Sequence, residues 1–386
     1  MKTCSNCVIP ETSETLIFDK NNKCSVCTQI KEKKQINWKK KEEDLDLLIN
    51  QYKDKYEYDC VIPFSGGKDS TFTLWYLVTQ KKVKPLVIRF DHNFYRNNHE
   101  LNVEKTITKL GVDFINYKTN FDIVKKTMIE SLIRRGDFCW HCHVGVSALP
   151  INIAIEKKIP LIFFGEPSSE YSSYNDYEEL EEMDNERFNK VSNLGINAED
   201  MFEMVKERYP NEQINIRDFK PYTFPNPREL IDNKIKSRFL GNYISWDVKE
   251  QVKIIKKELD WRGDNVEGIP ESYDYEKIEC MMQGVRDYIK FLKRGFGRTA
   301  HLTSIDIRNN RMNRDKALEL CKIYDGKKPK SLDIFLKIIK ISEDEFYDLI
   351  QKQIVAPNKI WDKEVIKNDK SNITPSDFDG WIKKFN

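Results

Sequence analysis

The chain has 386 residues, of which 39% are hydrophobic and 33% charged, and its formal net charge is +2. This composition excludes collagen-like, low-complexity and largely disordered classes, and the small charge gives no bulk attraction to nucleic acid or to an anionic membrane. No stretch approaches the roughly 18 apolar residues of a membrane span, and the N-terminus lacks the apolar core of a signal peptide. We therefore expect a cytoplasmic protein of two or more domains, with no nucleic-acid or membrane partner.

The first thirty residues contain two CxxC pairs. Cys4 and Cys7 are separated by sixteen residues from Cys24 and Cys27. Each pair can deliver two thiolates from one tight turn, and four converging thiolates make the closed tetrahedral site of structural zinc. We predict a zinc ribbon over residues 1–30, with two disulfides or an iron site as the alternatives. The metal replaces a core that so short a segment cannot build.

Residues 31–57 are rich in Lys and Glu, with apolar residues interspersed, and predict a helical linker of one helix or two. Its basic residues could contact RNA phosphates. Four acidic residues follow them directly, at positions 42, 43, 44 and 46. A solvated helix face is therefore the favoured interpretation.

A short apolar run over 58–64 leads into the hexamer Ser65-Gly66-Gly67-Lys68-Asp69-Ser70, where a helical pattern begins. A strand, a glycine turn and a helix start together aim backbone N–H groups at an anion. Lys68 adds a positive charge and the serines add hydroxyls, whereas Asp69 beside phosphates calls for a bridging Mg²⁺. The hexamer is not the GxxxxGK[ST] pattern, because its two glycines are adjacent and aspartate follows the lysine. We predict a nucleotide-binding loop of Phe64, Ser65, Gly66, Gly67, Lys68, Asp69 and Ser70.

The hexamer resembles the signature of the PP-loop ATP pyrophosphatases, which cleave ATP between the α and β phosphates. The resemblance implies a parallel-sheet α/β domain of the adenine nucleotide alpha hydrolase-like type, expected here over 58–170. It also implies that the loop holds the departing pyrophosphate while a substrate oxygen takes AMP. In that chemistry Lys68 stabilises charge and Asp69 is the residue linked to magnesium.

Strand patterns over 85–90, 112–117 and 159–164 alternate with helix patterns over 97–110 and 121–134. This rhythm is typical of a parallel sheet, in which ligands collect beyond the carboxyl ends of the strands. Arg89 and Asp91 close one strand, and Gly165 and Glu166 follow another. We expect these four residues to contact the adenine and the ribose.

A third CxxC pair lies in Cys139-Trp140-His141-Cys142-His143. Sulfur-transferring relatives among the PP-loop enzymes, which thiolate tRNA, carry a CxxC in a comparable place, where it binds an iron–sulfur cluster or forms a persulfide. By that resemblance, Cys280 or Cys321 supplies the third ligand. The alternative is a segment lining the substrate site, in which the thiols, His141 and His143 pack or contact substrate.

The distal half is less regular. Residues 171–215 contain polar and acidic runs and predict an exposed insertion or lid, and residues 216–327 form a distal part of the catalytic region with helices over 228–237 and 248–259. Lys293, Arg294 and Arg298 surround two glycines, which suggests a turn that contacts a sugar carboxylate, a sugar-nucleotide phosphate or ATP. A plain surface turn is the alternative. Residues 328–386 predict a helical tail, with Ser342 and Glu345 as a capping box.

The ribbon, the SGGKDS loop, the CWHC segment and the block from LGNYISWDVKEQ to KRGFGR occur in one order. That order resembles the N-acetyl sugar amidotransferase family over nearly the whole chain. Those enzymes convert a sugar acetamido group to an acetamidino group in bacterial surface-glycan pathways, with products such as acetamidino forms of pseudaminic acid, legionaminic acid or a diacetamido uronic acid. The resemblance implies ATP, Mg²⁺ and structural Zn²⁺, and ammonia from glutaminase-like and cyclase-like subunits, since this chain shows no glutaminase constellation.

Two hypotheses compete with this one. The first is a PP-loop enzyme that transfers sulfur to tRNA or another acceptor through Cys139 and Cys142. The near-neutral charge and the lack of a clear basic RNA-binding domain argue against it. The second is a nucleotide-binding subunit without activity, against which the intact Lys68 and Asp69 argue.

Overall fold

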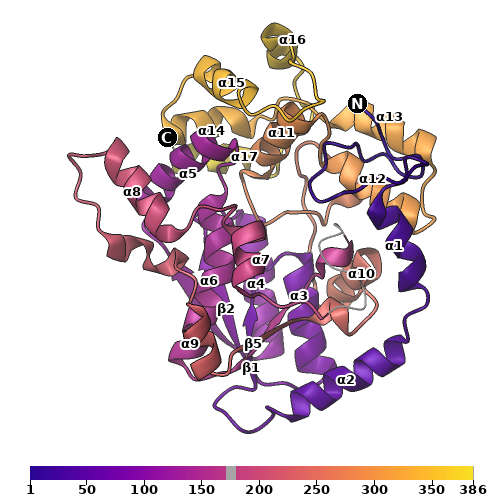
Figure 1. Cartoon of the computed structure of the whole chain (residues 1–386), viewed down its shortest axis with the longest axis vertical. Helices are drawn as coiled ribbons and strands as arrows, with labels where there is room; N and C mark the ends of the chain where they lie inside the picture. Colours follow the sequence, from indigo (N-terminus) through magenta and orange to yellow (C-terminus); the bar gives the residue numbers. More distant parts are fainter. Residues whose placement is uncertain (171–179, 386) are drawn as a thin grey trace.

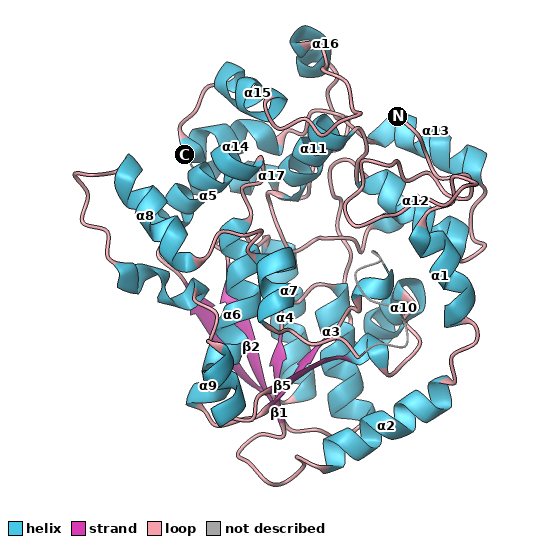
Figure 2. Ribbon diagram, viewed as in Figure 1, coloured by secondary structure: helices cyan, strands magenta, loops and turns pink. Residues whose placement is uncertain are grey.

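The structure is a computed structural model that describes residues 1–170 and 180–385 (Figure 1). A parallel five-stranded sheet lies in the lower half of the view, with helices around it and a second group of helices above it (Figure 2). The strands are β1 (Cys60–Pro63), β2 (Pro85–Asp91), β3 (Asp113–Lys118), β4 (Leu161–Phe164) and β5 (Lys236–Phe239). They stand in the order β3-β2-β1-β4-β5. The predicted α/β class with a parallel sheet is confirmed.

Helices cover both faces of the sheet, because successive strand residues point to opposite sides. In β1, Cys60 and Ile62 join a buried cluster with α2 (Trp38–Asn50), α3 (Lys68–Trp75) and α10 (Val248–Leu259). Val61 points the other way, into a cluster with α6 (Trp140–Glu156) and α8 (Ala198–Arg208). Gly145 of α6 lies so close to the sheet that an added Cβ would stand 2.3 Å from the Phe90 ring.

The order of the strands creates a switch point next to β1. The chain runs outward from β1 to β2 and β3, then returns to place β4 on the other side of β1, where Val61 pairs with Ile162. The carboxyl ends of β1 and β4 are therefore neighbours, and ligands of open parallel sheets bind at such points. The helices that connect β2, β3 and β4 are α4 (Asn97–Leu110), α5 (Phe121–Arg135) and α6, close to the predicted ranges.

The predicted helix over 228–237 is wrong in its second half. A capping box between Asn226 and Glu229 starts α9 (Pro227–Asp232), and Lys234 then adopts a left-handed φ of +54° that ends it. The chain continues as β5, which pairs with β4 at the edge of the sheet. Sequence pattern misses this strand because Lys-Ser-Arg-Phe has no apolar run; its pairing with the β4 backbone and the packing of Phe239 on Phe164 decide its conformation.

The predicted linker over 31–57 contains α2 and the end of α1 (Ser25–Lys33), a helix that begins inside the segment predicted as the ribbon. The predicted helical C-terminal region is confirmed. Helices α11 (Gln283–Arg294), α14 (Ser331–Ile339), α15 (Glu343–Gln351) and α17 (Phe378–Phe385) share a buried cluster with α5. The predicted capping box of Ser342 and Glu345 begins α15. The N-terminal cysteines pack against α12 (Arg298–Arg308) and α13 (Arg314–Tyr324). The remaining elements are η1 (Tyr76–Gln80), η2 (Ser168–Glu170), α7 (Asn185–Arg187), η3 (Phe188–Ser192), η4 (Ile216–Tyr222), η5 (Leu240–Asn242), η6 (Glu271–Tyr273) and α16 (Lys363–Asn368).

The predicted insertion over 171–215 lies outside the described residues between 171 and 179. Its described part contains α7, η3 and α8, and Met183, Phe188 and Met201 are buried in the cluster beside α6. From 180 onward the segment is therefore packed onto the domain. Within the described residues, no single helix has both the length and the apolar character to cross a membrane; α5 and α6 meet those criteria only as a pair bent by 115°.

Candidate functional site

The predicted nucleotide-binding loop connects the central strand β1 to α3. The Ser70 hydroxyl ties it together: it accepts the amides of Ser65 (3.2 Å) and Gly66 (3.1 Å) and donates to the Gly67 carbonyl (3.2 Å). The Ser65 hydroxyl accepts the Gly67 amide at 3.3 Å. Helix α3 begins at Lys68 without a side-chain cap. The loop therefore presents an uncapped helix N-terminus, the arrangement that binds phosphate groups.

Gly66 is required by the backbone of this loop. Its φ is +80°, and an added Cβ would stand 2.4 Å from Val103. Trp261 Nε1–H donates to the Gly66 carbonyl at 3.1 Å, and His99 Nε2 lies 2.7 Å from the Ser65 carbonyl. Burial lowers the pKa of His99 to about 4, so the neutral ring donates its Nε2–H to that carbonyl. Two distant side chains thus hold the loop in its binding conformation.

Lys68 is buried and paired with two carboxylates. Its ammonium lies 2.8 Å from Asp69 Oδ2 and 2.8 Å from Glu276 Oε2. Glu276 also lies 3.5 Å from Arg298, which pairs with Asp287 at 3.0 Å. Burial on its own would raise the pKa of Glu276, but the charges of Lys68 and Arg298 hold that pKa at about 2. The ionised Glu276 and its partners therefore position the Lys68 ammonium.

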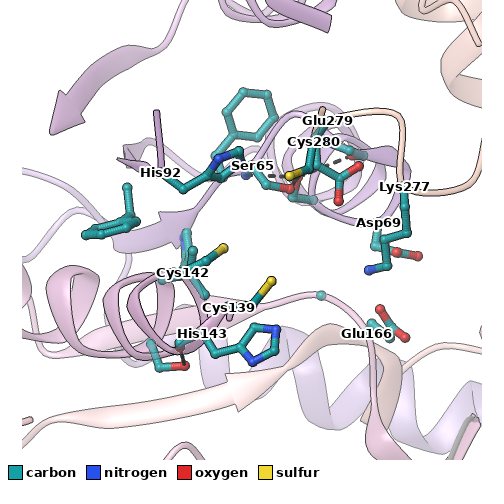
Figure 3. Close-up of a pocket in the computed structure, with 18 of the residues that line it drawn as sticks. Ser65, Asp69, His92, Cys139, Cys142, His143, Glu166, Lys277, Glu279 and Cys280 are labelled. Atoms are coloured by element: carbon teal, nitrogen blue, oxygen red, sulfur yellow. Dashed lines mark hydrogen bonds between the residues drawn. The ribbon is translucent and has the colours of Figure 1, made fainter. Parts of the chain in front are cut away.

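A cavity of about 380 Å³ opens beside the loop (Figure 3). This volume lies in the range of small-molecule sites. The predicted residues that line it are Phe64, Ser65, Gly67, Lys68, Asp69, Ser70, Cys139, His141, Cys142, His143, Gly165, Glu166 and Cys280. The structure thus brings the nucleotide-binding loop and the third cysteine pair into one site, with the segment that precedes α11 as a further wall.

Besides Lys68, the titratable side chains of Asp69, Glu166, Lys277 and Glu279 line the end of the cavity next to the loop. Asp69 Oδ1 is buried and has no hydrogen-bond partner among the described residues. Figure 3 shows Lys277 between Asp69 and Glu166, with Glu279 above them. Burial and the Asp69 charge raise the pKa of Glu166 to about 8. A buried carboxylate oxygen without a partner, beside further carboxyl groups, fits a hard cation such as Mg²⁺.

The other end of the cavity carries sulfur and imidazole groups. Cys139 precedes the first residue of α6, Cys142 and His143 lie in its first turn, and Cys280 precedes α11. Figure 3 shows the three thiols around a common space. Burial raises the pKa of Cys142 and of Cys280 to about 12 and lowers that of His143 to about 4, so these groups are neutral thiols and a neutral imidazole.

The four N-terminal cysteines fit a structural metal. Within the described residues, only Cys4, Cys7, Cys24 and Cys27 bring three or more metal-ligating atoms within 4.8 Å of one another, and all four are buried. Cys7 Sγ lies 3.8 Å from Cys24 Sγ. This matches the edge, about 3.8 Å, of a tetrahedron with Zn–S bonds of about 2.3 Å. The predicted four-cysteine site is confirmed; the identity of its ion, zinc, stays a prediction.

Other predicted residues lie elsewhere. Arg89 is buried and pairs with Glu100 at 2.8 Å and with Asn116 at 2.8 Å. Asp91 accepts the Asn93 amide at 2.7 Å. Arg89 and Asp91 thus have partners of their own, and neither lines the cavity. A contact of these two residues with a nucleotide stays a prediction that the geometry does not favour.

The three cations around the glycines after α11 serve contacts between segments. Lys293 donates to the carbonyls of Arg135 (2.6 Å) and Gly136 (3.1 Å), and Arg294 binds the Thr12 carbonyl. Together with Arg298 they line a smaller cavity next to the large one. A direct contact with substrate stays a prediction for all three. Cys321, the alternative third ligand, lies near the ribbon and does not line the large cavity.

The sequence reasoning missed several residues of the site. His99 and Trp261 hold the loop, Glu276 pairs with Lys68, and Lys277 and Glu279 line the cavity. All of them except His99 lie beyond position 260, about 190 residues or more along the chain from the loop. The mixed acidic and basic residues over 274–279 indicate that this segment forms ion pairs. The sequence does not show which distant residues are their partners.

The segment that precedes α11 and lines the cavity belongs to a range of the chain that matches a known protein family. Residues 267–384 match the family model described as "LPS biosynthesis protein WbpG-like, C-terminal domain". Residues 267–384 are therefore similar to the C-terminal domain of WbpG-like proteins. The match confirms the predicted resemblance to a sugar-modifying amidotransferase family over this part of the chain and supports a role in glycan biosynthesis. Glu276, Lys277, Glu279 and Cys280 all belong to the matched range.

Two further similarities are weaker. An uncharacterized protein of Methanocaldococcus jannaschii, MJ1599, is 29% identical over 145 residues, which are 36% of this chain and 50% of that protein, so the chain spans half the length of this relative. Among solved structures, the U34-tRNA thiolase NcsA from Methanococcus maripaludis with its [4Fe-4S] cluster is 15% identical, with 85% of this chain and 90% of that chain covered. Its TM-score of 0.30 is too low to support an argument.

Proposed function

We propose that the chain is an ATP-dependent amidotransferase that converts a sugar acetamido group to an acetamidino group in bacterial surface-glycan biosynthesis. One observation carries the proposal: the nucleotide-binding loop and the WbpG-like domain line the same cavity. The loop supplies the chemistry of ATP cleavage, and the domain links that chemistry to glycan biosynthesis. The reaction consumes the acetamido sugar, ammonia and ATP and releases the amidine, AMP and pyrophosphate.

The chemistry needs an activated oxygen. An amide carbon resists ammonia because its oxygen is a poor leaving group. In the proposed reaction the amide oxygen attacks the α-phosphorus, the bond to the β-phosphate breaks, and the amide nitrogen gives up its proton, which leaves an O-adenylyl imidate. Ammonia then adds to the imidate carbon, and AMP departs with the former amide oxygen.

Each part of the cavity has a task in this scheme. The uncapped N-terminus of α3 and the buried Lys68 stabilise the charge that grows on pyrophosphate, an effect that in other enzymes contributes several kcal/mol. Asp69, with its unpartnered Oδ1, is the residue to hold Mg²⁺, which supplies further neutralisation of the phosphates when bound. The cysteine and histidine end, with neutral side chains, has room for the sugar. Ammonia comes from glutaminase-like and cyclase-like partners.

Labelled substrate tests the proposal. An acetamido sugar with ¹⁸O in the amide is incubated with ATP, Mg²⁺ and ammonia, and the products are analysed by mass spectrometry. We expect oxygen to be replaced by NH only when ATP is present, and the label to appear in AMP. Lys68→Ala should abolish both, whereas Lys257→Ala on the exposed side of α10 should not. Label retained in the sugar, or conversion without ATP, would contradict the route.

Sulfur transfer is the second candidate function, because three thiols from two segments line the nucleotide cavity. Anaerobic purification followed by iron and sulfide analysis distinguishes the two. Iron bound in the wild type and lost in Cys139→Ser, together with thiolation of tRNA and unchanged acetamido sugars, would favour sulfur transfer. Colourless, iron-free protein that converts an acetamido sugar would favour the amidotransferase.

A further inference from the structure

Lys277 has an unusual backbone conformation for its place in the chain. Its φ is +53°, a left-handed value that costs energy for any residue with a Cβ. Four other lysines share such a φ, namely Lys82, Lys158, Lys234 and Lys340, and each of them ends or directly follows a helix. The left-handed residue is a common way to end a helix. Lys277 instead lies in the irregular segment between η6 and α11, so this explanation does not apply to it.

The neighbours of Lys277 fix its position. Glu276 is buried and held by Lys68 and Arg298, and Tyr275 and Ile278 are buried as well. With both flanking residues anchored, the left-handed turn directs the side chain of Lys277 into the cavity. Strained backbone that persists next to a cavity is a recurring property of functional sites.

The ammonium group of Lys277 has carboxyl groups nearby, but it forms no ion pair with any of the described residues. Among the described parts of the chain, no carboxylate lies within ion-pairing distance of it, and no hydrogen bond to it is formed. The nearby cations Lys68 and Arg298, in contrast, are each paired with carboxylates. Glu166 and Glu279 also form no ion pair with the described residues, and Figure 3 shows both side chains in the same cavity as Lys277. Lys277 is therefore a cation that an anionic ligand can pair with at no cost in existing contacts.

Lys277 lies at the end of the cavity next to the loop. Figure 3 shows its ammonium between Asp69 and Glu166 at the nucleotide end. The cavity that Lys277 lines is also lined by Cys142 and Cys280 at its other end. One cation thus lines the cavity that carries both the carboxyl groups beside the loop and the thiols.

We propose that Lys277 is a catalytic residue that binds the α-phosphate of ATP. This assignment rests on the proposed function, in which the loop and Lys68 hold the two terminal phosphates. The α-phosphate then lies next to these two phosphates at the same end of the cavity, where Lys277 is a cation without an ion pair among the described residues. As the substrate oxygen bonds to the α-phosphorus, the electron pair of the breaking bond leaves with pyrophosphate, and Lys277 remains protonated and neutralises the non-bridging oxygens of the adenylyl group.

The test compares Lys277→Gln and Lys277→Gly with the wild type. We expect sugar-dependent AMP release to fall about 10²-fold in both variants, the loss that follows removal of one charge-stabilising donor. Calorimetric titration with AMP and with inorganic pyrophosphate supplies a readout apart from turnover. Lys277→Gln should weaken AMP and leave pyrophosphate unchanged, whereas Lys68→Gln should weaken pyrophosphate.

A stability control separates catalysis from folding. Lys277→Gly should unfold at the same temperature as the wild type or above it, because glycine adopts φ +53° without strain. Lys340→Gly, at the exposed end of α14, is the matched substitution away from the cavity, and it should keep full activity. Lower stability in Lys277→Gly than in the wild type, with a rise in Lys340→Gly, would refute the argument from strain.

The remaining outcomes distinguish the two proposals. Wild-type conversion of an acetamido sugar with equal rates and equal AMP affinity in Lys277→Gln would overturn the role of Lys277 and leave the proposed function standing. No conversion of any acetamido sugar, with AMP binding that still depends on Lys277, would refute the function and support Lys277 as the contact for the α-phosphate.

Discussion

Glu166 links the stability of this protein to pH. It follows β4 at the switch point, and burial together with the Asp69 charge raises its pKa from 4.5 to about 8. Between these two values the folded protein holds a proton that the unfolded chain has released. The free energy of unfolding must therefore fall as the pH rises from about 4.5 to about 8. Glu166→Gln removes the titration and keeps the shape of the protonated side chain.

The magnitude follows from the two pKa values. At about 1.4 kcal/mol for each pH unit, the difference between 4.5 and 8 amounts to about 5 kcal/mol at most. The side chain is partly accessible, so solvent screening reduces this figure. We expect Glu166→Gln to gain about 2 to 4 kcal/mol relative to the wild type between pH 5 and pH 8.

Urea denaturation at pH 5, 6.5 and 8 measures this gain directly. The wild type and Glu166→Gln should have similar stability at pH 5 and separate progressively above it. Glu203→Gln removes an exposed carboxylate from α8 and should follow the wild-type curve at every pH. Parallel curves for the wild type and Glu166→Gln would refute the reasoning, because they would mean that Glu166 ionises in the folded protein as it does in the unfolded chain.

Three further predictions concern the loop, the buried charges and the ribbon. Gly66→Ala should lower the free energy of unfolding, measured by urea denaturation, by about 1–3 kcal/mol and abolish ATP cleavage, because its φ is +80° and Val103 occupies the space of the added methyl group. Gly111→Ala is the control, since its φ is +61° and no atom lies within 4 Å of the added Cβ. It measures the backbone cost alone and should keep activity. Arg298→Gln should lower the free energy of unfolding by about 3–5 kcal/mol, since Glu276 and Asp287 lose a buried partner. Arg228→Gln at the surface should change the free energy of unfolding little. Equal losses in the two variants would contradict the stabilising role of the buried ion pairs of Arg298. Cys4→Ser should remove bound zinc in elemental analysis and lower the melting temperature; a metal-free wild type of unchanged stability would argue for another role of the four thiols.

The features that the sequence predicted well are those encoded by neighbours along the chain. The two CxxC pairs, the loop from Phe64 to Ser70 and the capping box at Ser342 all depend on contacts within a few residues or on a spacing that one turn can close. Helices α4 and α10 follow the period of their apolar residues. β5 shows the limit, because its conformation comes from pairing with β4 and its own residues carry no strand pattern.

Long-range partners could not be predicted in the same way. Lys68 and Arg298 are both cations beside glycines in the sequence, yet Lys68 lines the cavity beside the loop and Arg298 contacts Lys68 only through Glu276. Lys293 and Arg294 carry the same kind of charge and bind backbone carbonyls of other segments. A charge pattern indicates that a buried charged residue needs a partner, but the packing of distant segments determines which residue that partner is.

By itself, then, the sequence determined the four-cysteine site, the strand, loop and helix around Ser65–Ser70 and the parallel α/β class, since short-range hydrogen bonds and alternating burial leave their period in the residues. Only the tertiary structure decided that the segment before α11 lines the cavity beside the loop, and that Lys277 faces this cavity while its neighbour Glu276 pairs with Lys68 and Arg298. The physical reason is that a buried ion pair such as Lys68 with Glu276 forms only where the fold brings opposite charges from distant segments together closely enough to offset the loss of their hydration.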